Sequence, residues 1–319
     1  MRQPRQRRIM RLGIVIPCYN EEEVLEHSIT RLSTLLAGLI AKGRVDAASR
    51  IWIVDDGSSD ATWTITEALA RNNSQVAGIK LSCNRGQQNA LLAGLLTAEG
   101  DALITMDSDM QDDMGVIENM IEEFRLGADV VYGVRKARAS DTLFKRKTAE
   151  AFYRLMSLMG ARTVYNHSEY RMLSRRAIES LREYKEVNLF LRGIVPLIGY
   201  KSSLVYYDRT ERFAGESKYS LAKMVALAVD AITSFSVVPL RVITFTGFFI
   251  FLASMAITMW VLWVRIFTPN ALPGWASTVL PMYFLGGIQI LCIGVIGEYL
   301  GKIYAEVKAR PRFTIEKII

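Results

Sequence analysis

The chain is poor in the residues from which disulfide frameworks and structural metal sites are built. Its 319 residues include three cysteines, which lie far apart and form no C-x-x-C pair, and two histidines, His27 and His167. Neither a disulfide-stabilised fold nor a structural zinc site is therefore expected. The 8 prolines and 22 glycines are also too few for a fibrous or low-complexity chain.

Charged residues are scarce as well, at 22% of the chain against 50% hydrophobic residues. This balance is too apolar for a disordered chain and carries fewer charges than a wholly soluble enzyme. The charges are also unbalanced, because 39 Lys+Arg against 32 Asp+Glu give a net charge of +7.

Residues 1–11 form a basic arm with five arginines and no acid, and no apolar signal-peptide segment follows. We interpret the arm either as a solvated tail or as a contact to anionic lipid headgroups.

Short apolar runs alternate with helix-length amphipathic segments from residue 12 to about residue 135. Five runs end in polar or glycine-rich turns, at residues 13–18, 51–54, 76–81, 102–106 and 129–134. This alternation predicts an α/β domain with a mostly parallel sheet covered on both faces, and we expect it to span residues 12–216. Ligands of such sheets bind at the carboxyl ends of the strands, so the polar residues there are the candidate site residues.

Two uncharged runs near the end of the chain, residues 242–264 and 275–297, are each 23 residues long. Each is long enough to cross a hydrocarbon core of roughly 30 Å at about 1.5 Å per residue, so we expect two transmembrane helices within residues 236–303. Lysine and arginine flank the pair, whereas the connecting loop carries one charge. The positive-inside rule then places the large domain and both termini, including a tail of residues 304–319, in the cytoplasm.

The segment between the large domain and the first of these runs, residues 217–235, has apolar residues at helical spacing. It predicts an amphipathic helix that lies in the membrane surface, and an ordinary surface helix of the large domain is the alternative.

Carboxylates follow two of the expected strands. The fourth run ends in MDSDMQDD, where Asp107 and Asp109 are separated by one residue. Such a pair on an extended chain points to one side and can hold a divalent cation whose other ligands come from substrate phosphates. The second run ends in VDDGSSDAT, and Asp56 is expected at the level of Asp107, where a carboxylate accepts from a base N–H or a ribose hydroxyl.

The motifs, taken in order, resemble those of glycosyltransferase family 2. Within that family the chain looks like the membrane-anchored polyprenyl-phosphate glycosyltransferases, which include bactoprenol glucosyltransferases and dolichol-phosphate mannose synthases. The resemblance rests on IPCYNEEE (16–23), VDDGSSDAT (54–62), NRGQQNALLAGL (84–95), MDSDMQDD (106–113), the basic segment at Arg171, RTERFAGESKY (209–219), the two apolar spans and VKARPRF (307–313).

The resemblance implies a Rossmann-like GT-A fold that binds a nucleotide sugar, with Mg²⁺ or Mn²⁺ bridging the donor diphosphate. It implies that Asp109 is the direct metal ligand, that Asp107 faces metal or ribose, and that Glu169 stands where the family has a suggested base. The implied donor-binding residues are Pro17, Tyr19, Asn20, Glu21, Asp56, Asn84, Gly86, Gln87 and Gln111. The candidate ligands of the acceptor phosphate are Arg135, Arg138, Arg171, Arg209, Arg212, Ser217 and Lys218.

The expected function is inverting transfer of one sugar, glucose from UDP-glucose, to undecaprenyl phosphate at the cytoplasmic face of the bacterial inner membrane. The product would be a lipid-linked sugar for cell-envelope glycosylation, such as O-antigen modification of lipopolysaccharide. Transfer of mannose, N-acetylglucosamine or an aminoarabinose derivative remains open, because no residue distinguishes these sugars. The non-enzymatic alternative is a basic membrane-anchored scaffold, whereas binding of nucleic acid is not expected. Glycines of the second span permit close helix packing and hence a homo-oligomer.

Overall fold

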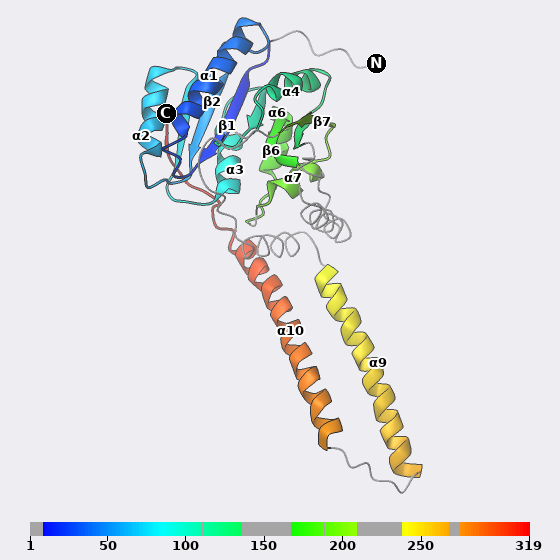
Figure 1. The fold of residues 1–319 in the computed structure, drawn as a ribbon. Helices are drawn as coiled ribbons and strands as arrows, with labels where there is room; N and C mark the ends of the chain where they lie inside the picture. Colours follow the sequence, from blue (N-terminus) through cyan, green and yellow to red (C-terminus); the bar gives the residue numbers. More distant parts are fainter. Residues whose placement is uncertain (1–8, 110–111, 136–166, 188, 209–237, 268–274) are drawn as a thin grey trace. The chain divides into compact units, whose positions relative to one another are not determined.

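Figure 1 shows the computed structural model of the chain. The structure describes residues 9–109, 112–135, 167–187, 189–208, 238–267 and 275–319. The described residues divide into an α/β unit, which runs to residue 208 and includes residues 310–319, and a helical unit between residues 238 and 309. Most of the basic arm, residues 1–8, and the amphipathic segment 217–235 lie outside the described residues.

The five apolar runs that predict strands all form strands, β1 to β5. The elements of the α/β unit are β1 (Leu12–Cys18), α1 (Leu25–Ala41), β2 (Arg50–Asp55), α2 (Thr62–Asn72), β3 (Val76–Leu81), α3 (Gln87–Thr97), β4 (Ala102–Thr105), α4 (Val116–Arg125), β5 (Val130–Arg135), β6 (His167–Ser174), α6 (Arg175–Arg182), α7 (Leu191–Leu197), β7 (Ser202–Tyr207) and β8 (Ile315–Ile318). Together they form the predicted α/β fold.

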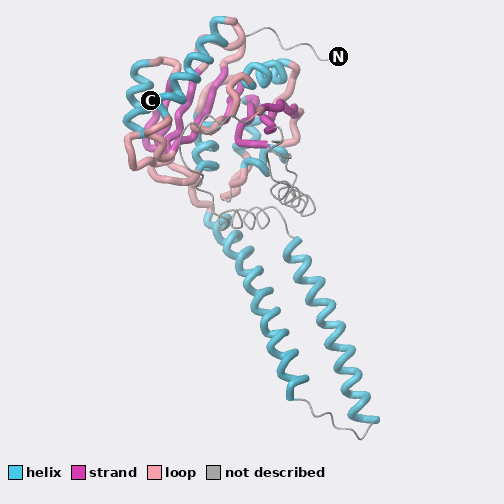
Figure 2. The backbone as a smooth tube through the Cα atoms, in the orientation of Figure 1, coloured by secondary structure: helices cyan, strands magenta, loops and turns pink. Residues whose placement is uncertain are grey.

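The strands, magenta in Figure 2, form one sheet. It has eight strands in the order β7-β5-β6-β4-β1-β2-β3-β8. Strands β1 to β5 and β7 run in one direction, whereas β6 and β8 run antiparallel to their neighbours. The predicted parallel character of the sheet is confirmed for most of its strands. The antiparallel insertion of β6 between β4 and β5 did not follow from the sequence pattern, and it determines how the candidate site is assembled.

Helices cover the sheet on both faces. On one face, α1 contacts β2 and α4 contacts β5 and β7, and α1 contributes apolar side chains at helical spacing: Leu25, Ile29, Leu32, Leu36 and Leu39. On the other face, α3 lies so close to the sheet that a Cβ atom at Gly94 would lie 2.3 Å from Cγ1 of Val15. A residue with a side chain at position 94 would therefore push α3 away from the sheet, and α3 carries part of the site.

The C-terminal strand β8 was not expected, because the sequence pattern predicts a tail over residues 304–319. In the structure Ile315–Ile318 pairs antiparallel with β3, and the carbonyl of Thr314 accepts a hydrogen bond from the Ser82 N–H at 3.0 Å. Without β8, β3 would be an edge strand with a row of unpaired backbone groups, which is a reason for a short strand to cover it.

The helical unit consists of α9 (Val238–Phe267) and α10 (Trp275–Lys308), which contain the two uncharged runs. Among the described residues, one stretch, Ile288–Lys308, is long and apolar enough to cross a membrane, and none of it is buried; Val238–Ile250 is a shorter apolar stretch. Large apolar side chains are exposed on both helices, with Phe249 at 67% and Ile290 at 74%.

Candidate active site

The loops that follow β1 and β2 are joined by hydrogen bonds at the carboxyl edge of the sheet. Asn20, which has a positive φ of 52°, donates its N–H to Oγ of Ser58 at 3.0 Å, and its Oδ1 accepts from the Ser59 N–H at 2.9 Å. The adjacent Tyr19 is 47% exposed. This hydrogen-bonded turn leaves the aromatic side chain exposed, in the segment where the resemblance implies nucleoside binding.

Asp56 connects the β2 loop to the loop between β3 and α3. It is buried, and its two carboxylate oxygens accept from the N–H groups of Arg85 at 2.7 Å and Gly86 at 2.8 Å. Burial raises the pKa of Asp56, whereas these two N–H donors act in the opposite direction. Gly57, with φ 69°, packs against the same loop, since a Cβ atom there would lie 2.6 Å from the carbonyl carbon of Cys83.

The other donor-binding candidates lie on the same edge or within β1. Pro17 is buried in β1, and Glu21 is half-buried and donates its N–H to Oγ1 of Thr62 at 2.9 Å. Asn84 and Gly86 are exposed in the β3–α3 loop, where Gly86 has a φ of 85° that favours glycine. The structure therefore brings these candidates to one edge of the sheet, with Pro17 near the end of β1 and the others in the loops that follow the strands.

Carboxylates crowd together after β4. Asp107 and Asp109 are half-buried, and Oδ1 of Asp107 accepts from Nε2 of Gln87 at 2.7 Å. Burial, together with the negative charges of Asp112 and Asp109, raises the pKa of Asp107 to about 6. Among the described residues, no three His, Cys, Asp or Glu side chains converge as a complete metal cage. Two crowded carboxylates fit a hard divalent cation that takes its remaining ligands from a substrate.

Arg135, the last residue of β5, contacts another carboxylate of the same acidic segment, Asp112. Its NH2 group donates to Oδ1 of the buried Asp112 at 3.3 Å, and its Nε donates to the hydroxyl of Tyr207 at 3.1 Å. The Tyr207 hydroxyl also donates to Asp112. Burial lowers the pKa of Arg135, but Asp112, Tyr207 and Asp107 together raise it by more, so the net shift of the pKa is upward. The side chain is 27% exposed and can present a positive charge at the rim of the site.

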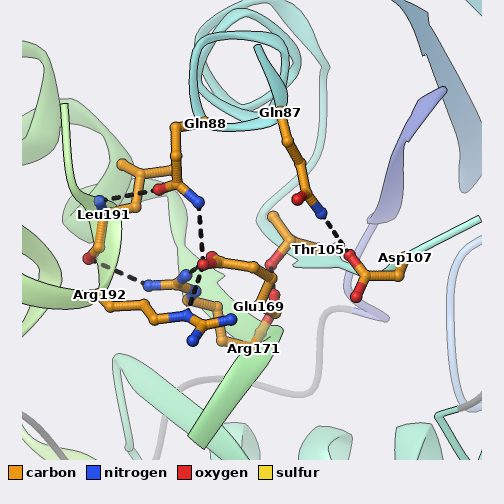
Figure 3. A network of polar contacts seen from close by, with 8 residues as sticks. All are labelled: Gln87, Gln88, Thr105, Asp107, Glu169, Arg171, Leu191 and Arg192. Atoms are coloured by element: carbon orange, nitrogen blue, oxygen red, sulfur yellow. Dashed lines mark hydrogen bonds and ion pairs between the residues drawn. The ribbon is translucent and has the colours of Figure 1, made fainter. Parts of the chain in front are cut away.

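Glu169 reaches the same region because β6 is antiparallel to β4. Arg171 pairs with Thr105, the last residue of β4, so the residues before Arg171 continue past the end of β4 toward the level of Asp107. Oε1 of Glu169 accepts from Nε of Arg192 at 2.7 Å and from Nε2 of Gln88 at 2.9 Å, and Oε2 is paired with Arg171 (Figure 3). The carboxylate is buried among three donors.

The position of Arg171 corrects the sequence analysis. Its side chain is 1% exposed, paired with Glu169, and donates to the carbonyl of Leu191 at 3.1 Å. Burial and the like charge of Arg192 lower the pKa of Arg171 to about 10, so it remains charged at neutral pH. A buried guanidinium that already contacts Glu169 and Leu191 is not placed to bind a lipid phosphate, and these contacts hold Glu169 in position.

Several predicted residues cannot be placed, and three site residues were missed. Gln111, Arg138, Arg209, Arg212, Ser217 and Lys218 lie outside the described residues. The missed residues are Gln88, Asp112 and Arg192. The only sequence signal for Arg192 is a single basic residue in the otherwise uncharged stretch VNLFLRGIVPLIGY (187–200). Its proximity to Glu169 depends on the long-range pairing of β6.

Comparison with known proteins identifies the family. Residues 13–182 match the model of Glycosyl transferase family 2. This chain belongs to glycosyltransferase family 2. It is 46% identical to the uncharacterized glycosyltransferase YkoT of Bacillus subtilis over 96% of this chain and 91% of that protein. It is 38% identical to the SfII prophage-derived bactoprenol glucosyl transferase of Shigella flexneri over 97% of this chain and 98% of that protein.

A third relative, the uncharacterized glycosyltransferase sll0501 of Synechocystis, is 36% identical over 96% of this chain and 95% of that protein. The glycosyltransferase is therefore similar to these proteins over the α/β unit and the helical unit alike. The α/β unit is the GT-A-like fold that the resemblance implied, and the carboxyl edge of its sheet is the candidate active site.

Proposed function

We propose that this glycosyltransferase moves a single sugar from a nucleotide sugar to a polyprenyl phosphate, with inversion at the anomeric carbon. The substrates proposed first are UDP-glucose and undecaprenyl phosphate. The observation that carries the proposal is the crowded pair Asp107 and Asp109 beside the Glu169 cluster, at the carboxyl edge of a family 2 fold. The name of the Shigella relative, which covers 97% of this chain, supports the acceptor class and the sugar.

The chain supplies alignment and charge for this displacement. Asp109 and Asp107 would hold the divalent cation, Mg²⁺ or Mn²⁺, which when bound stabilises the charge that develops on the diphosphate leaving group. The loops around Tyr19, Asn20 and Asp56 would hold the nucleoside, with Pro17, Glu21, Asn84, Gly86, Gln87 and Gln111 as the other proposed donor residues.

A phosphate oxygen of the acceptor forms the new bond to the anomeric carbon while the bond to the donor diphosphate breaks. Because a phosphate monoester has a second pKa of about 6, it is largely dianionic at neutral pH and needs no strong general base. The residues proposed to attract it are Arg135, whose side chain is partly exposed, and Arg138, Arg209, Arg212, Ser217 and Lys218. Glycosyl transfer by this route therefore depends on orientation and electrostatics more than on proton transfer.

We propose that α9 and α10 both span the bacterial inner membrane, with residues 217–235 as an interfacial helix and the catalytic domain and both termini in the cytoplasm. The exposed apolar side chains of the two helices and the lysine and arginine residues outside the two runs support this topology. A membrane anchor would bring the site to the surface where the phosphate of a carrier lipid lies. A homo-oligomer formed through the helices stays a prediction.

The function is tested by incubating membranes that contain the protein with undecaprenyl phosphate, Mn²⁺ and radiolabelled UDP-glucose, GDP-mannose or UDP-N-acetylglucosamine. Label from UDP-glucose is expected to become extractable into organic solvent, and membranes without the protein serve as the control. If label from another donor becomes extractable instead, the assigned sugar changes, whereas the assigned reaction stays the same. No extractable label from any donor, together with no binding of nucleotide sugars, would favour the scaffold alternative.

The affinity of the purified protein for Mn²⁺ is expected to rise with pH and to level off above about pH 7. Without a cation the pKa of Asp107 is about 6, so below that pH the carboxyl carries a proton that a cation must displace. Release of one proton gives an increase of about tenfold per pH unit below the pKa. Binding can be measured from the electron paramagnetic resonance signal of free Mn²⁺ at several pH values. The Asp107→Asn variant should show a flatter profile, and an equally steep profile would contradict the assignment.

A further inference from the structure

Arg192, on α7, has a guanidinium whose hydrogen-bond donors are only partly used. Its side chain is 40% exposed, and among the described residues its only hydrogen-bond and ion-pair partner is Glu169, which accepts from Nε at 2.7 Å. The two terminal nitrogens of the guanidinium keep their N–H donors for another ligand. A planar guanidinium with its Nε side anchored on a carboxylate is preorganised to bind a second anion with its outer edge.

Glu169 is arranged to hold the positively charged side chains of two arginines. Its two oxygens accept from Arg171, Arg192 and Gln88, and its side chain is 3% exposed. A general base needs a carboxylate oxygen within reach of the proton that it removes. Here Arg171 fixes the carboxylate from the buried side, and Arg192 occupies the side nearer to solvent, so the arrangement suits positioning better than proton abstraction.

The Glu169 cluster is adjacent to the acidic pair because two consecutive residues of α3 bridge them. Gln87 donates to Asp107 and Gln88 donates to Glu169, and Figure 3 shows both amides pointing from the start of α3 into the same region. The carboxamide oxygen of Gln88 also accepts from the N–H of Leu191, which fixes the residue next to Arg192. The positive charge of Arg192 is close enough to act on the pKa of Asp107.

We propose that Glu169 is a positioning residue and that it holds Arg192 as a binding residue for a substrate phosphate in the active site. The inference rests on the proposed function and adds to it a cation on α7, outside the basic segments at Arg135 and Arg209. The lipid phosphate of the acceptor and the diphosphate of the donor share the chemistry that the guanidinium recognises. The experiment below distinguishes these two sources.

The first test compares Arg192→Gln and Arg192→Lys with Arg182→Gln in the full-length protein. Arg182 is a matched control, because it is 49% exposed and pairs with Glu179 on α6. Two quantities are measured: the KM for undecaprenyl phosphate in the transfer assay, and the Kd for UDP in the presence of Mn²⁺. Arg192→Gln is expected to weaken one of them by about tenfold to a hundredfold, which is the usual size for a hydrogen bond to a charged group. Arg192→Lys should recover part of the loss.

The two measurements identify the phosphate. A raised KM for undecaprenyl phosphate with an unchanged Kd for UDP assigns Arg192 to the acceptor, and the reverse assigns it to the donor. Values for Arg192→Gln that equal those of Arg182→Gln in both measurements would overturn the proposal. If the wild-type protein transfers no sugar, the proposed function fails. The Kd for UDP is then the only measurement that tests Arg192, and an unchanged Kd in Arg192→Gln would count against its role.

The second test concerns Glu169. Glu169→Gln is expected to raise the same constant that Arg192→Gln raises and to leave kcat and its pH dependence largely unchanged, since the acid only positions the arginine. A large fall in kcat at unchanged KM, with loss of the acidic limb of the pH profile, would restore the general-base role and overturn the positioning role. The thermal transition of each variant shows whether it is folded, and Arg192→Gln, which keeps the buried Arg171 pair, remains informative if Glu169→Gln unfolds.

Discussion

Sugar transfer by the Asp109→Asn variant is expected to fall by at least about a thousandfold. Asp109 is half-buried in the acidic segment after β4, where burial and neighbouring carboxylates already raise the pKa of Asp107 to about 6. An amide in place of Asp109 removes the charge that would hold the cation, and with it several kcal/mol of stabilisation of the leaving diphosphate, at about 1.4 kcal/mol for each factor of ten. The initial rate of lipid-linked label at saturating UDP-glucose measures the effect.

Asp113→Asn is the matched control, because Asp113 belongs to the same acidic motif but is exposed and accepts from the N–H of Gly115 at 2.8 Å. An asparagine oxygen can accept the same hydrogen bond, so this variant should retain its rate. Membrane insertion should be unchanged in both variants. Normal turnover by Asp109→Asn, or equal losses in the two variants, would remove the metal assignment from Asp109.

The Arg171→Met variant is expected to lose about 3–5 kcal/mol of unfolding free energy, the usual effect of removing one partner of a buried ion pair. Both members of the Arg171 and Glu169 pair are almost fully buried, and methionine fills the volume without the charge. Arg192 and Gln88 would still donate to Oε1 of Glu169, but Oε2 would lose its partner. For a domain of about 200 residues, a loss of this size lowers Tm by roughly 6–20 °C.

Thermal unfolding of the detergent-purified protein, followed by a spectroscopic signal of the α/β unit, measures this loss. Arg182→Met removes an exposed partner of Glu179 and should change Tm little, because exposed ion pairs contribute about 0–1 kcal/mol. The double change Glu169→Leu with Arg171→Met should recover part of the stability, since no buried charge of the pair then remains. A loss in Arg171→Met no larger than in Arg182→Met would show that the buried pair is not a stabilising contact.

The elements that the sequence predicted are those with a strong local pattern. The run 13–18 and its four counterparts were recognised as strands because each is apolar and stops at a turn, and all five form strands of the sheet. The acidic pair was recognised because it follows the fourth run directly. Local patterns of this kind depend on neighbouring residues, so they can be read without knowing the partners of a strand.

The missed features depend on residues far apart in the chain. β8 has four residues and lies more than 230 residues after its partner β3, so no local pattern identifies the pairing. Arg171 was predicted to be a phosphate ligand because it belongs to a basic segment of the family resemblance, whereas the strand that carries it is buried between β4 and β5. The pairing of strands, and not the residue type, decides which side chains are buried.

By itself the sequence determined that this chain has a mostly parallel α/β unit, acidic residues at the carboxyl ends of its strands and two long apolar runs. Tertiary structure alone decided that β6 runs antiparallel beside β4 and so carries Glu169 to the level of Asp107, with Arg192 beside it. The physical reason is that apolar periodicity acts within each element, whereas an active site is made by the register of strands that meet only after folding.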